Sequence, residues 1–245
     1  MILLRAVLCA VGFLTRIPVP GRGAFPPAVL GLSIVFFPAV GLLLGAASAG
    51  AAALVPSPHL GWAIVLVAIH AFLTGAMHLD GLSDVIDGLG GARGDRERAL
   101  EIMRDPRVGA FGVVALVLVL TAKIAAVDAV LRRPDAWPAL LAYPAAGRLA
   151  AVPLIVGFPC ARASGMAHAY HEAARWPAVP AALLFAGLPA AFAPSLLVPT
   201  AAALGAGLLA GLYITWRLRG LTGDAYGAAI ELAELAFLWA VVGKP

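Results

Sequence analysis

The chain has 245 residues, of which 62% are hydrophobic and only 12% are charged, and its formal net charge is +4. A soluble domain carries about a quarter charged residues, and a soluble domain of this length has too small an interior to hide so much apolar surface. A polytopic membrane protein is therefore expected. The basic residues are spread over the loops between apolar segments, as membrane topology requires, so no nucleic acid partner is expected.

The first 17 residues are apolar but short for a membrane span, and they predict an interfacial or re-entrant helix. Prolines and glycines in the following loop end this helix. Seven longer apolar segments then predict about seven transmembrane helices. The expected fold is an all-α membrane bundle that forms a single domain over residues 1–245. The seven predicted spans are residues 28–55, 60–79, 110–131, 137–158, 178–198, 199–218 and 225–242.

The distribution of lysine and arginine predicts the orientation of this bundle. If the N-terminus is cytoplasmic, the loops on the cytoplasmic side carry twelve basic residues and those on the other side carry three. The positive-inside rule favours this arrangement. The charged segment of residues 80–109 is then expected to face the cytoplasm.

Residues 80–109 connect the second and third predicted spans and carry the densest group of charges in the chain. The first part of this segment is expected to continue the second span as a helix. At about 100° per residue, a helix places Asp80, Asp84 and Asp87 on one face. Because like charges repel one another, most strongly near hydrocarbon, a cation is expected between them. The alternative is a solvated acidic helix end.

Hard divalent cations prefer oxygen ligands, and Mg²⁺ in proteins typically binds one or two carboxylates together with phosphate oxygens. The three aspartates are therefore predicted to be metal ligands and catalytic residues that act on a phosphoryl group. Gly81 and Gly88 are expected to let a substrate approach the helix backbone. His78 precedes Asp80 by two residues and is a candidate to contact substrate or metal.

The second part of the segment has the pattern of an amphipathic helix with many charges. Its glutamates, together with Arg96 and Arg98, are equally well explained as ion pairs on a surface helix. Arg104 and Arg107 stand at the end of this helix, where the chain returns to the membrane. Because the arginine fork matches phosphate oxygens, these two residues are predicted to bind the phosphates of a substrate.

A second group of acidic residues lies near the C-terminus. Asp224, Glu231 and Glu234 share one side of the last predicted span, and ionisable residues inside a membrane span indicate function. All three are predicted to bind substrate. Two alternatives stay open: Asp224, or Thr222 before it, caps the helix, and the two glutamates pair with basic residues inside the bundle. The basic residues within the predicted spans are Lys123 and Arg148.

Four stretches of the chain resemble the cobalamin synthases, also called adenosylcobinamide-GDP ribazoletransferases. The most specific are HLDGLSDVIDG (78–88) and EIMRDPRVGAFG (101–112), and FLTRIPVP (13–20) and LTGDAYGAAIELAEL (221–235) agree as well. The resemblance implies an integral enzyme of the bacterial inner membrane that needs Mg²⁺. It also implies the reaction, in which adenosylcobinamide-GDP and α-ribazole, or its 5′-phosphate, give adenosylcobalamin, or its phosphate, and GMP. The loop of residues 159–177 matches only loosely, so no role is predicted for it.

Two other functions remain as alternatives. The acidic motif is similar to that of the CDP-alcohol phosphotransferases, whose aspartates bind metal, which supports Asp80, Asp84 and Asp87 as metal ligands. However, Ala92-Arg93 comes one residue late for that family's spacing and the later aspartates do not follow it. A transporter would use the charged residues within the spans as an ion path, but the sequence shows no paired broken helices in two halves. A homo-oligomer stays open.

Overall fold

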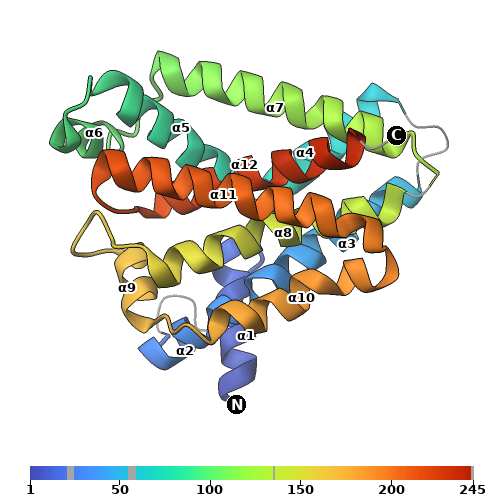
Figure 1. The fold of residues 1–245 in the computed structure, drawn as a ribbon, viewed down its shortest axis with the longest axis horizontal. Coiled ribbons are helices and arrows are strands. Elements are labelled where there is room, and N and C mark those ends of the chain that lie inside the picture. Colours follow the sequence, from blue (N-terminus) through green and yellow to red (C-terminus); the bar gives the residue numbers. More distant parts are fainter. Residues whose placement is uncertain (21–24, 55–58, 135, 244–245) are drawn as a thin grey trace.

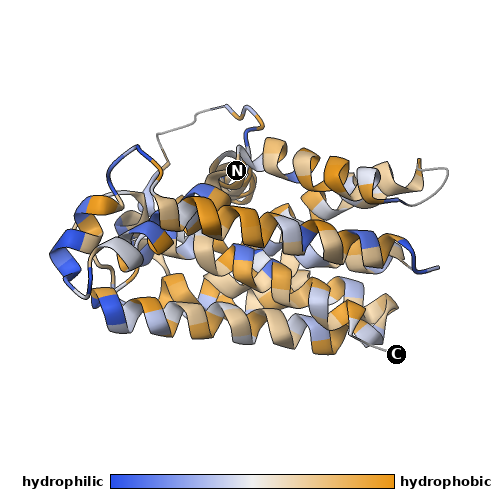
Figure 2. Ribbon diagram, turned by 90° about the horizontal axis from the view of Figure 1, so that it is seen from above, coloured by the Kyte–Doolittle hydropathy of each residue, from blue (hydrophilic) through white to orange (hydrophobic). Residues whose placement is uncertain are grey.

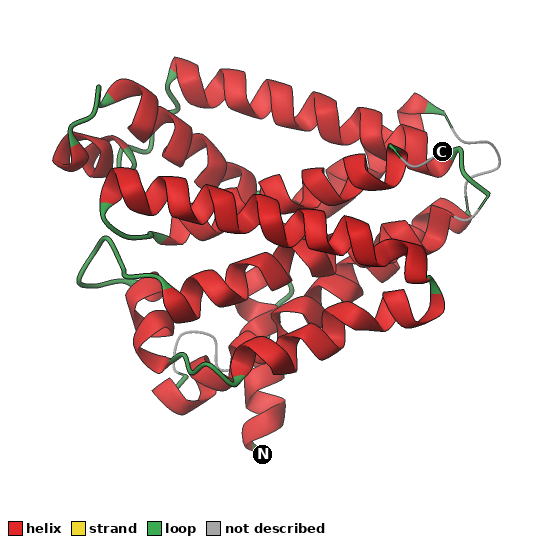
Figure 3. Ribbon diagram, in the orientation of Figure 1, coloured by secondary structure: helices red, strands yellow, loops and turns green. Residues whose placement is uncertain are grey.

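The computed structural model describes residues 1–20, 25–54, 59–134 and 136–243. Over these residues the chain forms helices joined by short loops (Figures 1 and 3), and the β pairing within them is one isolated bridge between Cys160 and Leu221. The prediction of an all-α membrane bundle is confirmed. The elements are α1 (Ile2–Leu14), α2 (Pro27–Ser33), η1 (Ile34–Phe36), α3 (Phe37–Ala53), α4 (Leu60–Thr74), α5 (Met77–Gly91), α6 (Arg96–Ile102), α7 (Ala110–Leu131), α8 (Ala136–Gly157), α9 (Met166–Ala173), α10 (Ala178–Phe192), η2 (Pro194–Leu196), α11 (Leu197–Leu218) and α12 (Gly223–Val242).

Five segments in the described part of the chain are long and apolar enough to cross a membrane. They agree with five of the seven predicted spans. Most residues of α8 are buried, whereas only a minority of those in α7 and α11 are, as expected of helices that face lipid. The five segments are Pro27–Ala53, Ala110–Leu131, Ala136–Gly157, Pro194–Leu218 and Gly223–Val242.

The predicted span over residues 60–79 is wrong as one continuous helix. It consists of α4 and α5, which meet at an angle of 88°. Gly75 and Ala76 have φ angles of 65° and 56°, and their amides donate to Phe72 O at 3.1 Å and to Ala71 O at 2.7 Å. This pattern is a Schellman motif, which ends a helix. The acidic helix is therefore aimed independently of the segment before it.

The predicted span over residues 178–198 is also shorter than expected. Helix α10 has 15 residues, and at 1.5 Å per residue it extends about 22 Å, short of a hydrocarbon core of about 30 Å. Pro189 lies within it, and Pro194 begins the next element, so the chain turns early. At the N-terminus, the short helix that the sequence predicts is present as α1.

Hydrophilic residues gather at one end of the bundle, around α6 (Figure 2). Four connections meet here: residues 92–95, 103–109, 158–165 and 219–222. We call this region the polar end. Arg96 ties it together, because its Nε donates to Leu218 O at 2.7 Å and its Nη2 to Ala161 O at 3.1 Å. Arg96 also pairs with Glu97, which agrees with the alternative of ion pairs on a surface helix, but its contacts with the two loops are the ones that hold the polar end together.

Candidate active site

Asp87 caps a neighbouring helix. Its two carboxylate oxygens accept the amides of Gly109 and Gly112, each at 2.8 Å, so the side chain of α5 satisfies the first turn of α7. A Cβ at Gly109 would lie 2.4 Å from Asp87 Oδ1, and one at Gly112 would lie 2.3 Å from Oδ2. Glycine is therefore required at both positions, and Asp87 is engaged in a structural task that the sequence did not predict.

The other two aspartates of α5 are open to a ligand. Asp80 is exposed and Asp84 is half-buried. Asp84 lies within electrostatic reach of Asp80, Asp87 and Asp224, so the two acidic groups of the sequence come together although they are far apart along the chain. The side chains of Asp80, Asp84 and Asp224 form what we call the acidic cluster.

Gly81 makes this meeting of α5 and α12 possible. A Cβ at this position would lie 2.7 Å from the backbone oxygen of Asp224 and 2.9 Å from its Cα, so the two helices touch through their backbones. Gly88 packs in the same way against Met103 and Ala99 of the α6 region. The prediction that these two glycines make room for a substrate is wrong, because both make room for a helix.

The predicted alternative cap of α12 is resolved in favour of Thr222. Its hydroxyl accepts the amide of Ala225 at 3.2 Å, and Asp224 faces Arg162 instead, with 3.6 Å between Nη1 and Oδ2. Arg162 is the functional candidate that sequence reasoning missed. Its only signal was a loose family match in a loop.

The acidic cluster suits a hard cation, but it supplies only part of the cation's ligands. In the described residues no group of three or more His, Cys, Asp or Glu side chains is placed to hold a metal ion. Mg²⁺, however, usually takes only one or two protein carboxylates and completes its shell with phosphate oxygens and water. Asp80, Asp84 and Asp224 fit that requirement better than the predicted trio, because Asp87 already binds two backbone amides.

Two adjoining cavities open beside the acidic cluster. The first has a volume of about 170 Å³ and a largely apolar wall, with His78, Asp80 and Asp224 as its ionisable lining residues besides two tyrosines. The second has a volume of about 150 Å³ and lies between the loop that carries Arg162 and the start of α12. Asp224 lines both cavities. Met166, Ala167 and Gly223 are the other residues that line both.

The two arginines predicted to bind phosphate stand apart from these cavities. Arg107 is exposed and forms a two-pronged pair with Asp105, at 2.9 and 2.7 Å. The hydrogen bonds from Arg107 lower the pKa of the Asp105 carboxyl to about 2. Arg104 is exposed as well. Neither lines the cavities beside the acidic cluster, so the structure does not bring these arginines together with the aspartates.

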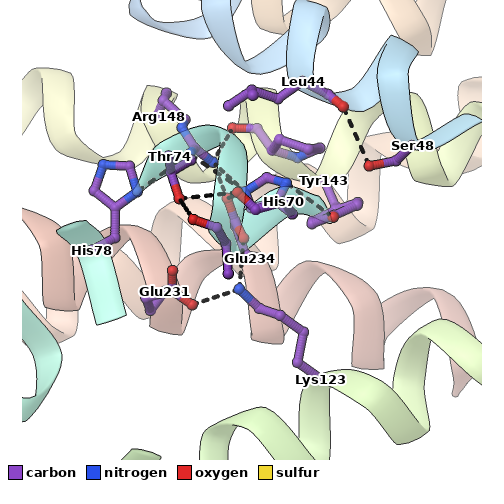
Figure 4. Close-up of polar contacts among 12 residues, drawn as sticks. Leu44, Ser48, His70, Thr74, His78, Lys123, Tyr143, Arg148, Glu231 and Glu234 are labelled. Atoms are coloured by element: carbon purple, nitrogen blue, oxygen red, sulfur yellow. Dashed lines mark hydrogen bonds and ion pairs between the residues drawn. The ribbon is translucent and has the colours of Figure 1, made fainter. Parts of the chain in front are cut away.

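A buried polar network occupies the middle of the bundle (Figure 4). Lys123 Nζ lies 2.5 Å from Glu231 Oε2 and 2.8 Å from Glu234 Oε2, and Arg148 pairs with Glu234. Two cations thus neutralise two anions, and all four side chains are buried. Gly147 is needed here because a Cβ would lie 2.6 Å from Glu234 Cγ.

This network decides between the interpretations of the two glutamates. The alternative that Glu231 and Glu234 pair with Lys123 and Arg148 is what the structure contains, and both glutamates are shielded from solvent rather than presented to a substrate. His78 sits at the edge of the network. Its Nδ1 lies 3.2 Å from Nη2 of Arg148, while its Nε2 is buried with no hydrogen-bond partner among the described residues.

Fold and site together define an integral membrane protein whose acidic helix meets a second carboxylate-bearing helix at one end of the bundle. The sequence profile of the cobalamin-5-phosphate synthase family matches residues 6–242. This protein therefore belongs to the cobalamin-5-phosphate synthase family.

Relatives agree with this assignment. An adenosylcobinamide-GDP ribazoletransferase of Geotalea daltonii is 41% identical over 98% of this chain and 98% of its own length. A protein with the same name from Thiobacillus denitrificans is 41% identical over 96% of this chain and 94% of its own length. Another from Alkalilimnicola ehrlichii is 42% identical over 96% of this chain and 93% of its own length. No solved structure matches the chain.

Proposed function

We propose that this protein is a Mg²⁺-dependent transferase that joins adenosylcobinamide-GDP to α-ribazole, or to its 5′-phosphate, and releases GMP in a late step of cobalamin biosynthesis. Its relatives carry the name of this activity. The observation that carries the proposal is the meeting of Asp80 and Asp84 with Asp224 beside two cavities at the polar end. Carboxylates gathered in this way suit the binding of a metal-linked diphosphate.

In this reaction a ribose hydroxyl oxygen of the acceptor, one that is free in both α-ribazole and its 5′-phosphate, forms a bond to the phosphorus attached to cobinamide, and the bond from that phosphorus to the GMP oxygen breaks. Mg²⁺, when bound, would neutralise the charge that develops on the phosphate oxygens. Asp80 and Asp224 would hold it. Asp84, half-buried among other carboxylates, would accept the proton of the attacking hydroxyl.

The volumes of these two cavities also limit which parts of the substrates can enter them. At about 170 and 150 Å³, each is smaller than the roughly 300–1,000 Å³ of a pocket for a whole small-molecule ligand. The phosphates and the reacting sugar would enter, while the corrin ring stays at the surface. The excess of basic residues in loops predicted to be cytoplasmic supports an inner-membrane protein whose acidic cluster faces the cytoplasm.

The alternatives fare less well. An ion path would need charged residues that line an open route, but the intramembrane charges pair with one another. A CDP-alcohol phosphotransferase would use the same carboxylate chemistry on another nucleotide, so the substrates must be compared directly.

The deciding experiment uses the purified full-length protein in detergent with Mg²⁺. We expect GMP to be released when adenosylcobinamide-GDP and α-ribazole are both present, and no CMP from a CDP-alcohol with an alcohol acceptor. Asp80→Asn should abolish GMP release while leaving the elution profile and thermal unfolding unchanged. A folded wild-type protein that releases no GMP would contradict the proposal, and so would a fully active Asp80→Asn variant.

A further inference from the structure

Arg162 has an unusual position for an arginine. Its Nε and Nη2 are buried and have no hydrogen-bond partner within the described chain, and its Nη1 lies 3.6 Å from Asp224 Oδ2, too far for a hydrogen bond. A buried guanidinium nitrogen left unsatisfied costs about 1–3 kcal/mol. An orphaned donor of this kind in a native protein calls for an explanation, such as a ligand.

The loop around Arg162 is held firmly from both sides. Ala161 N donates to Leu221 O at 2.9 Å, and Leu221 N donates to Pro159 O at 2.8 Å, which forms the isolated β bridge. On the other side, Arg96 Nη2 donates to Ala161 O at 3.1 Å. The guanidinium is thus presented by a fixed backbone, which is what a binding residue requires.

The space in front of Arg162 suits a small anion. The cavity of about 150 Å³ is lined by Arg162, Ser164, His168, Thr222 and Asp224 among others, and it adjoins the cavity that Asp80 lines. Most nearby charge is negative, and Arg162 is the cation within electrostatic reach of both Asp84 and Asp224. A phosphate here would gain donors from Arg162 on one side and, through the metal, the carboxylates on the other.

We propose that Arg162 and the small cavity around it form a phosphate-binding subsite. The donors Nε and Nη2 form one edge of the guanidinium and match two phosphate oxygens. The proposal rests on the proposed function for its substrates, since it assigns one of their phosphates to this cavity. Two phosphates have the required chemistry: the diphosphate of the nucleotide-bearing substrate and the 5′-phosphate of α-ribazole phosphate.

The test compares wild type, Arg162→Gln, Arg162→Lys and the control Arg98→Gln, all in the full-length protein with Mg²⁺. Arg98 is an exposed arginine that pairs with Glu101 on the surface of α6. Calorimetry measures the binding of GDP and of α-ribazole 5′-phosphate. We expect Arg162→Gln to weaken one of these by at least about tenfold and Arg98→Gln to weaken neither. Arg162→Lys keeps the charge but loses the fork, so its loss should be intermediate.

The two arms identify the phosphate. A loss confined to GDP assigns the subsite to the nucleotide side, and one confined to α-ribazole phosphate assigns it to the acceptor. In the second case, Arg162→Gln should also abolish any preference in KM for α-ribazole phosphate over α-ribazole.

Equal binding by wild type and Arg162→Gln overturns the subsite, as does the absence of binding to wild type at millimolar ligand. Unchanged thermal unfolding of Arg162→Gln shows that a loss of binding is not due to misfolding. If Arg162→Gln is destabilised, the loss of binding is measured in Arg162→Lys instead. If wild type releases no GMP in the transfer assay but binds GDP through Arg162, the proposed function fails and the subsite survives.

Discussion

Asp87→Asn tests the division of the aspartates into one structural and two functional residues. The structure gives Asp87 two short hydrogen bonds from backbone amides at the start of α7, whereas Asp80 is exposed and belongs to the acidic cluster. The same chemical change should therefore affect stability at Asp87 and turnover at Asp80.

The magnitude follows from the two hydrogen bonds. A hydrogen bond to a charged group contributes about 1.5–3 kcal/mol, and a negative charge at a helix N-terminus adds about 0.3–1 kcal/mol. Asparagine keeps one accepting oxygen, but its NH₂ group faces the second backbone amide. One of the two hydrogen bonds is therefore lost, and the NH₂ group and the amide, both donors, face each other. We expect Asp87→Asn to lower the free energy of unfolding by about 3 kcal/mol. Asp80→Asn, which has no such contacts, should change it by less than about 0.5 kcal/mol.

The assay is unfolding of both variants in the same detergent, followed by circular dichroism, alongside GMP release by the fraction that remains folded. At low temperature, where Asp87→Asn is still folded, it should retain more activity than Asp80→Asn. If Asp87→Asn is as stable as wild type and completely inactive, Asp87 is a ligand of the metal or substrate, and its assignment as a helix cap is refuted.

Three further predictions concern the network, the helix contact and the metal. Lys123→Met leaves two buried glutamates without their shared cation and should lower the free energy of unfolding by about 3–5 kcal/mol, measured by denaturant titration. Gly81→Ala puts a Cβ 2.7 Å from the Asp224 backbone and should slow GMP release at least about tenfold. Gly50→Ala on α3, where a Cβ meets nothing within 4 Å, should not. EDTA should abolish GMP release and added Mg²⁺ should restore it; persistence in EDTA would exclude the metal role.

Apolar length predicted the spans well because a helix in lipid must satisfy its own backbone over the whole hydrocarbon thickness. Apolar length gave a wrong prediction at residues 60–79 because the end of α4 depends on the backbone conformation of two residues, which composition does not reveal. Gly75 was the available signal, as a glycine at a helix end favours the left-handed conformation. It failed at residues 178–198 because Pro194 begins a new element within an apolar run.

The candidate site was predictable as a set of residue types but not as a set of partners. Helical periodicity placed three aspartates on α5, yet the amides that occupy Asp87 come from Gly109 and Gly112, which lie more than twenty residues away. A contact of this kind is set by how α5 packs on α7. For the same reason, Arg162 gave only the weak signal of a loose family match: its proposed role rests on nitrogens that have no hydrogen-bond partner among the described residues, which no local pattern encodes.

The positions of the charges explain why the acidic cluster stays available for a ligand. Deep in the bundle, Glu231 and Glu234 are held by Lys123 and Arg148, because an unpaired carboxylate at that depth would be very costly. At the polar end, water lowers that cost, and among the described residues Arg162 is the cation within electrostatic reach of Asp84 and Asp224. The protein thus concentrates uncompensated negative charge where a cation can reach it. If the proposed function holds, the metal and the phosphates that it carries would therefore be expected to enter from the polar end.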